Sequence, residues 1–186
     1  MNNKTPILFI LSGLPASGKS TLAKLLAKEY RACYIRIDSI EQGLRDLCQM
    51  DIQGEGYRLS YRMAGDNLKL GLNVVADSCN PIKLTRDEWE TVATSNKADF
   101  VNIEVICSAI DELKTRLKTR QTDIPNLALP TWNDVQKRPY DSWTKARIII
   151  DTAKKPVNET FRELTEKINH YLNLTKHGSN NKPETT

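Results

Sequence analysis

The sequence has few aromatic residues, few histidines and no long apolar run. Aromatic residues make up 6% of its 186 positions, and two residues are histidine. No apolar run approaches the ~20 residues that a membrane-spanning helix needs. The first residues also lack the apolar stretch and cleavage site of a secretory signal peptide. We therefore expect a cytoplasmic protein that does not enter a membrane.

Cysteine pairs and an excess of charge of one sign are also missing. The four cysteines are widely spaced and form no C-x-x-C pair, which argues against a structural zinc site and a disulfide framework. The formal net charge is +4 and the isoelectric point is about 8.8. This mild excess does not exclude a nucleic-acid partner but does not favour one, because dedicated nucleic-acid binders usually have an isoelectric point above ~9 and a concentrated basic patch.

The chain is long enough for one domain with a sizeable core, since 39% of its residues are hydrophobic and 27% are charged. Short apolar runs rich in β-branched residues predict strands at 7–11, 33–37, 72–76, 101–106 and 147–150. Helical patterns separate or follow them at 21–30, 40–47, 58–70, 85–94, 109–120 and 158–174. This alternation predicts a single α/β domain with a parallel sheet covered on both faces.

Two segments depart from this alternation. Residues 121–139 contain three of the eight prolines and little periodicity, so we expect an excursion or lid over the sheet edge. Together with the end of the preceding helix, the lid is expected to cover about residues 116–140. Residues 175–186 are polar and predict a disordered tail, which leaves residues 1–174 as the folded domain.

The strongest signal is a complete G-x-x-x-x-G-K-[ST] motif between the first predicted strand and the first predicted helix. It consists of Gly13, Leu14, Pro15, Ala16, Ser17, Gly18, Lys19 and Ser20, and Thr21 follows it. The glycines permit turns in which backbone N–H groups converge on phosphate oxygens, and the helix N-terminus adds positive potential. Lys19 is then placed to reach the β- and γ-phosphates, and the Ser20 hydroxyl to ligate Mg²⁺. The motif therefore predicts a nucleoside triphosphate site.

Two carboxylates follow predicted strands, where open α/β sheets bind their ligands. Asp77 follows the run 72–76, in the position where Mg²⁺ must be held directly or through water. The alternative for Asp77 is a cap of the next turn. Asp38 follows the run 33–37 and is placed to accept the proton of an attacking hydroxyl. The alternative for Asp38 is a helix cap, because it begins a D-x-x-E capping pattern.

Arginines are the candidates for contacts with the transferred group and with the acceptor. Arg116 and Arg120 lie four residues apart on one predicted helix and share a face. We expect them to cover the moving phosphoryl group from the lid; the alternative is a solvated basic face. Arg45 and Arg62, on the helices after the second strand, are expected to bind the acceptor, with Arg45 holding an anionic group. Arg138 is a weaker candidate.

Two further strings match motifs of GTP-binding switches, but their context is wrong. The N-K-x-D match at residues 96–99 precedes the predicted strand 101–106, whereas it should follow a buried strand. The D-x-x-G match at residues 51–54 follows a helical stretch. We therefore do not expect a GTPase.

The motif residues also carry a resemblance to a known family. Residues 11–23 resemble the opening of small P-loop kinases of the zeta-toxin and polynucleotide-kinase type, and residues 35–41 resemble the segment with an Asp on their second strand. Chloramphenicol phosphotransferase, gluconate kinase and adenylyl-sulfate kinase belong to the same wider group. Residues 74–81, 129–132 and 138–143 resemble bacterial members described as AAA-family ATPases or kinases.

The resemblance covers about residues 7–151 and implies a P-loop NTPase fold. Its implied architecture is a three-layer sandwich with a five-stranded parallel sheet of order 2-3-1-4-5. It also implies that Asp38 is the general base, that Arg116 and Arg120 belong to the lid helix, and that adenine lies near residues 152–154.

From the motifs and this resemblance we expect an ATP- and Mg²⁺-dependent kinase that phosphorylates a hydroxyl of a small molecule. Lys19, Asp38, Arg116 and Arg120 are its expected catalytic residues. Three alternatives stay open: a polynucleotide 5′-hydroxyl kinase, a zeta-type toxin that phosphorylates a nucleotide sugar, and an ATP-binding regulator without enzymatic activity. The sequence leaves the acceptor and the oligomeric state open.

Overall fold

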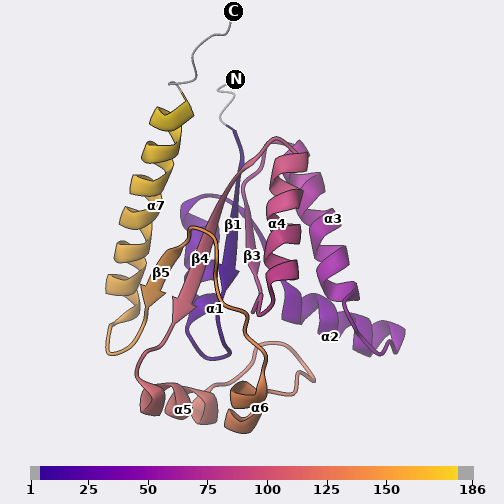
Figure 1. Cartoon of the computed structure of the whole chain (residues 1–186). Coiled ribbons are helices and arrows are strands. Elements are labelled where there is room, and N and C mark those ends of the chain that lie inside the picture. Colours follow the sequence, from indigo (N-terminus) through magenta and orange to yellow (C-terminus); the bar gives the residue numbers. More distant parts are fainter. Residues whose placement is uncertain (1–4, 180–186) are drawn as a thin grey trace, which may run out of the picture.

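The computed structural model describes residues 5–179 and contains a five-stranded sheet with helices on both faces (Figure 1). The strands are β1 (Ile7–Ser12), β2 (Cys33–Arg36), β3 (Val74–Asp77), β4 (Asp99–Ile106) and β5 (Ile148–Asp151). They lie in the order β2-β3-β1-β4-β5, and each pair of neighbours is parallel. The predicted α/β fold is thus confirmed, as is the strand order that the resemblance implied.

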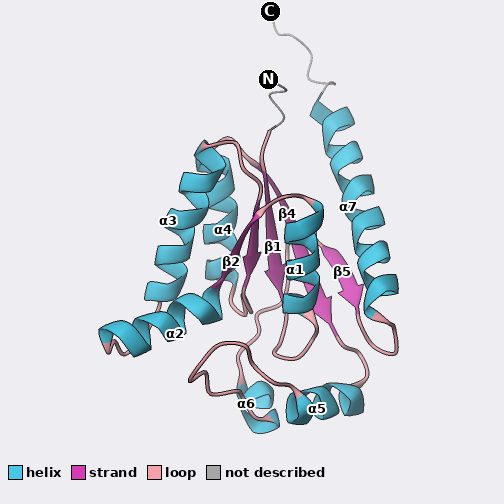
Figure 2. Ribbon diagram, turned by 180° about the vertical axis from the view of Figure 1, so that it is seen from behind, coloured by secondary structure: helices cyan, strands magenta, loops and turns pink. Residues whose placement is uncertain are grey.

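Four helices form the outer layers of the sandwich. Helices α1 (Lys19–Glu29) and α7 (Val157–Ser179) cover one face, and α3 (Glu55–Lys69) and α4 (Lys83–Ser95) cover the other (Figures 1 and 2). Right-handed crossovers between parallel strands place helices on both faces in this way. Both faces of the central strands are therefore withdrawn from water.

Strand β1 shows how the two layers divide the core. Phe9 and Leu11 pack with Leu26 of α1 on one face, since successive side chains of a strand point to opposite faces. Leu8 and Ile10 pack with α3 and α4 residues on the other face. All four β1 side chains are fully buried, and burial of such side chains stabilises the fold by roughly 1.5–3 kcal/mol each.

The remaining helices gather at the carboxyl ends of the strands. They are α2 (Ile37–Cys48), α5 (Ile110–Thr119) and α6 (Trp132–Lys137). Figure 1 shows α5 and α6 beyond the strand ends, so the residues predicted as a lid lie at the carboxyl ends of the strands. Sequence analysis also missed α6, which begins with a capping box of Thr131 and Asp134.

Helix α7 is longer than its periodicity predicts. It continues to Ser179, into the segment of residues 175–186 that the sequence predicts as a disordered tail. A helix that has already formed extends into polar residues at little cost in free energy, because each added residue also adds a backbone hydrogen bond. Residues 180–186 lie outside the described residues. No helix within residues 5–179 has both the length and the apolar character needed to cross a membrane.

A buried guanidinium attaches the segment after α6 to the rest of the fold. Arg86 on α4 is 4% exposed. Its Nε donates to the carbonyl of Asn80 and its Nη2 to the carbonyl of Asp141, each at 2.9 Å. The guanidinium also lies 4.2 Å from the centroid of the Trp143 ring. Arg86 therefore joins the loop after β3 to the segment that leads into β5.

Replacing Arg86 by methionine is expected to lower the free energy of unfolding by about 3 kcal/mol or more. The variant leaves several carbonyls without their donor, and each buried polar group without a partner costs ~1–3 kcal/mol. Urea denaturation measures the change. Arg58→Met is the matched control, because Arg58 on α3 is exposed and surface substitutions usually stay within ~0.5 kcal/mol. Equal stability of the two variants would contradict the anchoring role of Arg86.

Candidate active site

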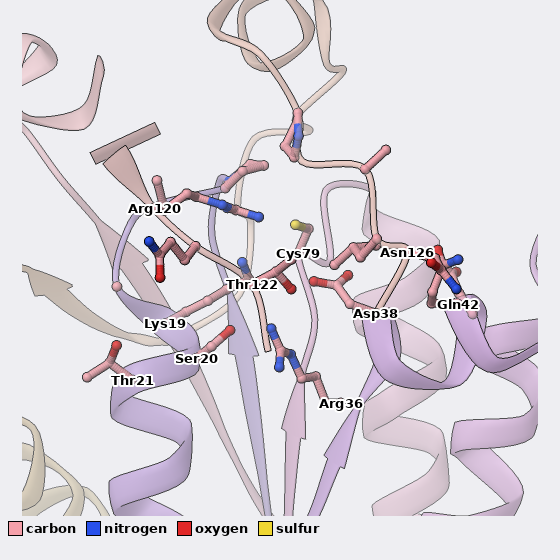
Figure 3. A pocket seen from close by; sticks show the side chains of 18 of the residues that line it. Lys19, Ser20, Thr21, Arg36, Asp38, Gln42, Cys79, Arg120, Thr122 and Asn126 are labelled. Atoms are coloured by element: carbon pink, nitrogen blue, oxygen red, sulfur yellow. The ribbon is translucent and has the colours of Figure 1, made fainter. Parts of the chain in front are cut away.

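A cavity of about 640 Å³ lies at the carboxyl ends of the strands (Figure 3). Its walls come from the loop between β1 and α1, the end of β2, the loop after β3, helix α2, the segment between α5 and α6 and the residue after α6. This volume lies within the usual range for sites that bind small molecules and cofactors. The cavity also lies where ligands of open α/β sheets bind.

The loop between β1 and α1 has a backbone that few sequences can adopt. Gly13, Ala16 and Gly18 have φ angles of 141°, 64° and 96°. A Cβ on Gly13 would lie 2.2 Å from the carbonyl oxygen of Val105, so no side chain fits there. The Gly13 N–H donates to the carbonyl of Cys79 at 3.1 Å. The glycines of the motif are therefore required by the loop's shape.

The loop presents a buried cation to the cavity. Lys19 is 8% exposed and lines the cavity. Burial alone lowers the pKa of its ammonium, but the Cys79, Asp77 and Asp38 groups around it raise the pKa above its ordinary value. Lys19 therefore stays protonated at neutral pH and keeps its charge for a phosphate group.

The remaining motif residues fit a phosphate ligand accompanied by a metal ion. Ser20 and Thr21 line the cavity at the start of α1, where the helix N-terminus favours anions. The Ser17 hydroxyl is buried and has no hydrogen-bond partner among the described residues. Ser17 itself does not line the cavity, so the hydroxyls of this region that a ligand can reach are those of Ser20 and Thr21.

Asp38 lies in the first turn of α2 and points into the cavity (Figure 3). Helix α2 begins at Ile37, with Arg36 as its N-cap and no side-chain cap bond. Asp38 is thus not the helix cap, which was the alternative that its D-x-x-E pattern allowed. Among the described residues no group donates a hydrogen bond to its carboxylate. The charge of Asp38 acts instead on Lys19 and Arg120, whose pKa values it raises.

Asp77 lies at the end of β3, beneath the cavity. It is 2% exposed and accepts a hydrogen bond of 2.7 Å from the Tyr34 hydroxyl. Burial raises the pKa of Tyr34, and the Asp77 charge raises it further, so this proton stays on the tyrosine. Asp77 does not itself line the cavity, but its charge also acts on Lys19. Its role toward Mg²⁺ stays a prediction.

The two arginines predicted to share a helix face are separated in the structure. Helix α5 ends at Thr119, and Arg120 turns out of it with ψ of 141° and lines the cavity. Burial lowers the pKa of Arg120, and Asp38 partly opposes this shift. Arg116 does not line the cavity; its Nη1 donates to Thr152 Oγ1 at 2.7 Å. The structure thus does not bring both arginines to the cavity, because the helix ends between them.

Arg116 instead braces the phosphate-binding loop. Its Nη2 donates to the carbonyl of Thr152 at 2.9 Å and pairs with Glu112 at 2.7 Å. The Thr152 hydroxyl in turn donates to the carbonyl of Ser17 at 2.8 Å. Arg116 is therefore a positioning residue for the loop, acting through Thr152.

Not all of the residues predicted to bind the acceptor line the cavity. Arg45 and Arg138 line the cavity. Arg62 is exposed on α3 and lies outside the cavity lining, because the buried positions of α3 on either side of it, such as Ser60 and Ala64, face the protein. The structure thus does not bring Arg62 to the site where it was expected.

Several residues that line the cavity were not predicted as site residues from the sequence. Glu41 and Gln42 join Asp38 and Arg45 on one face of α2. Their spacing of i, i+3, i+4 and i+7 is that of one helix face and was visible in the sequence. Cys79 also lines the cavity, but no sequence pattern distinguishes it from a cysteine of the core.

The segment between α5 and α6 bridges the cavity from α1 to α2. Asp123 accepts hydrogen bonds from Arg36 at 2.6 Å and from Lys24 at 2.8 Å. Arg36, and then Lys24, hold the pKa of Asp123 well below its ordinary value. On the other side, Asn126 donates to Asp46 of α2 at 3.3 Å. The segment that crosses the cavity therefore begins after α5, whose last residue is Thr119, and that it acts as a lid stays a prediction.

The structure agrees with the exclusion of a GTPase. Asn96 is the C-cap of α4, and Asp99 begins β4. This N-K-x-D match therefore lies at the amino end of the sheet, opposite the cavity. Within the described part of the chain, no three His, Cys, Asp or Glu residues are grouped to hold a metal ion on their own.

Solved structures of kinases share this architecture. The Mycobacterium tuberculosis APS kinase in complex with AMPPNP and APS is 17% identical over 89% of this chain and 98% of its own, with a TM-score of 0.66. A gluconokinase from Sinorhizobium meliloti is 15% identical over 90% of this chain and 98% of its own, with a TM-score of 0.60.

A third similar structure is Chaetomium thermophilum Kti12 in complex with ADP-AlF3. It is 19% identical over 87% of this chain and 96% of its own, with a TM-score of 0.64. No curated protein matches the chain. The family model described as AAA domain, AAA_33, matches residues 8–139, which include the phosphate-binding loop and most of the cavity. The chain therefore belongs to the AAA_33 family of AAA domains, and its fold is that of a small P-loop kinase.

Proposed function

We propose that the protein transfers the γ-phosphate of ATP to a hydroxyl group of a small molecule. The observation that carries this proposal is the Asp38 carboxylate, which points into the cavity beside Lys19 and Arg120 and accepts no hydrogen bond from the described residues. A carboxylate held in this way is suited to accept a proton from a bound substrate. A protein that only holds a nucleotide needs no such group.

The phosphate-binding loop and Lys19 bind the triphosphate in this proposal. Backbone N–H groups of the loop and the start of α1 face the phosphate oxygens, and Lys19 reaches the β- and γ-phosphates. Ser20, with Asp77 behind it, would hold the Mg²⁺ ion that accompanies ATP and neutralises part of its charge. The Arg116–Thr152 contact keeps the loop in this shape.

Phosphoryl transfer needs a base for the hydroxyl proton and positive charge beside the moving phosphoryl group. As the hydroxyl oxygen of the acceptor forms a bond to the γ-phosphorus, Asp38 accepts the proton of that hydroxyl. The bond between that phosphorus and the β–γ bridging oxygen breaks, and ADP leaves with the electron pair. Arg120, on the opposite wall, offsets the charge that spreads over the moving group. The site works mainly through positioning and electrostatics, as phosphoryl transfer requires.

Purified protein incubated with ATP, Mg²⁺ and single hydroxyl-bearing compounds tests the proposal. ADP release that depends on the added compound, together with a product heavier by one phosphoryl group in mass spectrometry, is the expected result. Tight ATP binding in calorimetry without ADP release for any compound would instead favour a nucleotide-binding regulator and contradict the kinase proposal.

A further inference from the structure

The wall of the cavity away from the phosphate-binding loop is one face of α2. Asp38, Glu41, Gln42 and Arg45 all line the cavity from this helix. Arg45 follows Asp38 by seven positions, which is roughly 10 Å along the helix axis. A compound whose hydroxyl lies at Asp38 and whose far end lies at Arg45 therefore has the length of a small metabolite.

Positive charge is in excess in the cavity and is concentrated in part at its far end. Five cationic residues line the cavity, against two carboxylates, Asp38 and Glu41. Lys19 and Arg120 face the triphosphate region. Of the remaining three, Arg36 is already paired with Asp123 at 2.6 Å. Arg45 and Arg138 are left for an acceptor.

These two arginines are weakly engaged by the protein. Arg45 approaches Glu41 at 3.6 Å, longer than a hydrogen bond. Arg138 forms no ion pair within residues 5–179, although its charge acts on Glu41. Guanidinium groups bind carboxylates and phosphates through paired hydrogen bonds. An oxyanion bound by Arg45 and Arg138 would therefore form stronger hydrogen bonds with them than Glu41 does.

No aromatic side chain is among the twenty residues that line the cavity. The aromatic residues nearest in sequence to the lining have other contacts: Tyr34 donates to Asp77, Trp132 packs against α5, and Tyr140 donates to Glu104. Proteins hold single-stranded nucleic acids largely by stacking bases on aromatic side chains. The acceptor part of the cavity therefore offers no aromatic side chain on which a base or another aromatic ring of an acceptor could stack.

We propose that the acceptor is a non-aromatic polyol that carries an oxyanion, a carboxylate or a phosphate. Arg45 and Arg138 hold the oxyanion, and the Glu41 carboxylate and the Gln42 amide oxygen accept hydrogen bonds from further hydroxyls. The Gln42 Nε2 already donates to Asp46 at 2.8 Å, which fixes the orientation of that amide. The inference rests on the proposed function, and the transfer step is the one described there, with the proton passing to Asp38.

Paired compounds test this acceptor class, each anion beside its neutral counterpart. The pairs are D-gluconate with D-glucitol and D-glucose 6-phosphate with D-glucose, joined by other pentose and hexose acids and phosphates. Adenosine and a 5′-hydroxyl oligonucleotide represent aromatic acceptors. We expect kcat/KM to be at least ~10-fold higher for the best anion than for its neutral partner, because one hydrogen bond to a charged group contributes about that factor. The two anion series separate sugar acids from sugar phosphates.

Binding is measured separately from transfer, on the complex with a non-hydrolysable ATP analogue and Mg²⁺. The best anionic polyol should raise the midpoint of thermal unfolding, and its neutral counterpart and adenosine should not. Binding of an anionic polyol without transfer would support the acceptor class and contradict the kinase proposal. Transfer that prefers a neutral or aromatic compound would overturn the acceptor class and leave the kinase proposal standing. Neither binding nor transfer with any anionic polyol would overturn the inference.

Two variants test the assigned arginines. Arg45→Gln and Arg138→Gln are each expected to raise KM for the anionic acceptor ~10-fold or more, with kcat and the KM for its neutral counterpart little changed, because the oxyanion lies away from the reacting atoms. Arg162→Gln is the matched control, since Arg162 is exposed on α7 outside the cavity lining. An unchanged KM in both cavity variants would remove the arginines from the acceptor site.

Discussion

Asp38→Asn is expected to reduce phosphoryl transfer by about 10²–10⁴-fold, the contribution that a positioned general base typically makes. Asparagine keeps the size and the polarity of the side chain, but its amide does not accept the hydroxyl proton. Because the Asp38 carboxylate accepts no hydrogen bond from the described residues and caps no helix, the substitution breaks no structural contact. The measurement is kcat for the best acceptor found, with ATP affinity determined by calorimetry.

ATP binding should survive in the Asp38→Asn protein, since Lys19 and the loop still hold the triphosphate. ATP affinity that rises slightly is also consistent, because one negative charge leaves the cavity. Asp66→Asn on α3 is the matched control, as Asp66 is exposed and pairs with Lys69 at 3.4 Å on the same helix. A fully active Asp38→Asn enzyme would exclude the base and leave Asp38 as an electrostatic contributor only.

The parts of the fold that the sequence predicted are those set by strong local patterns. Apolar runs such as residues 7–11 give strands with both faces buried, and the alternation with helices leaves little choice but a parallel sheet. The motif predicted where the phosphate-binding loop lies, because Gly13 and Gly18 adopt backbone angles in that loop that favour glycine. These features are local, and the structure confirms them.

Features that depend on where an element ends were predicted less well. The separation of Arg116 from Arg120 follows from α5 ending at Thr119, and no residue there marks the end as a glycine or proline does. Asp38 was predicted to follow a strand that ends at residue 37, whereas β2 ends at Arg36 and α2 begins already at Ile37. A shift of one or two residues in such a boundary decides which side chains enter a cavity.

Other features depend on contacts between distant segments and leave no local pattern. The lid residue Asp123 lies beside Arg36 and Lys24 only because the chain crosses the strand ends. Arg86 carries a charge but is buried among carbonyls from two loops. A sequence pattern marks both as ordinary surface charges, since the partners of Asp123 and the Asp141 partner of Arg86 lie far away along the chain.

Lys19→Ala is the second substitution for which we expect a very large effect, a loss of at least ~10²–10³-fold in kcat for transfer. One donor aimed at developing charge typically contributes this much, and Lys19 is the motif's only cation. Weaker ATP binding should accompany the loss. Both are measured against Lys28→Ala, whose lysine is exposed in the last turn of α1.

The reason lies in the balance of charge around the ammonium. Asp38 and Asp77 both raise the pKa of Lys19, which shows that the ammonium neutralises these carboxylates as well as serving a ligand. Without it the two carboxylates face the triphosphate uncompensated, so ATP should lose more affinity than ADP, which lacks the γ-phosphate that Lys19 reaches. Calorimetry with ATP and ADP measures this difference, and circular dichroism verifies the fold. Equal losses for the two nucleotides would place the Lys19 ammonium at the inner phosphates and away from the transferred group.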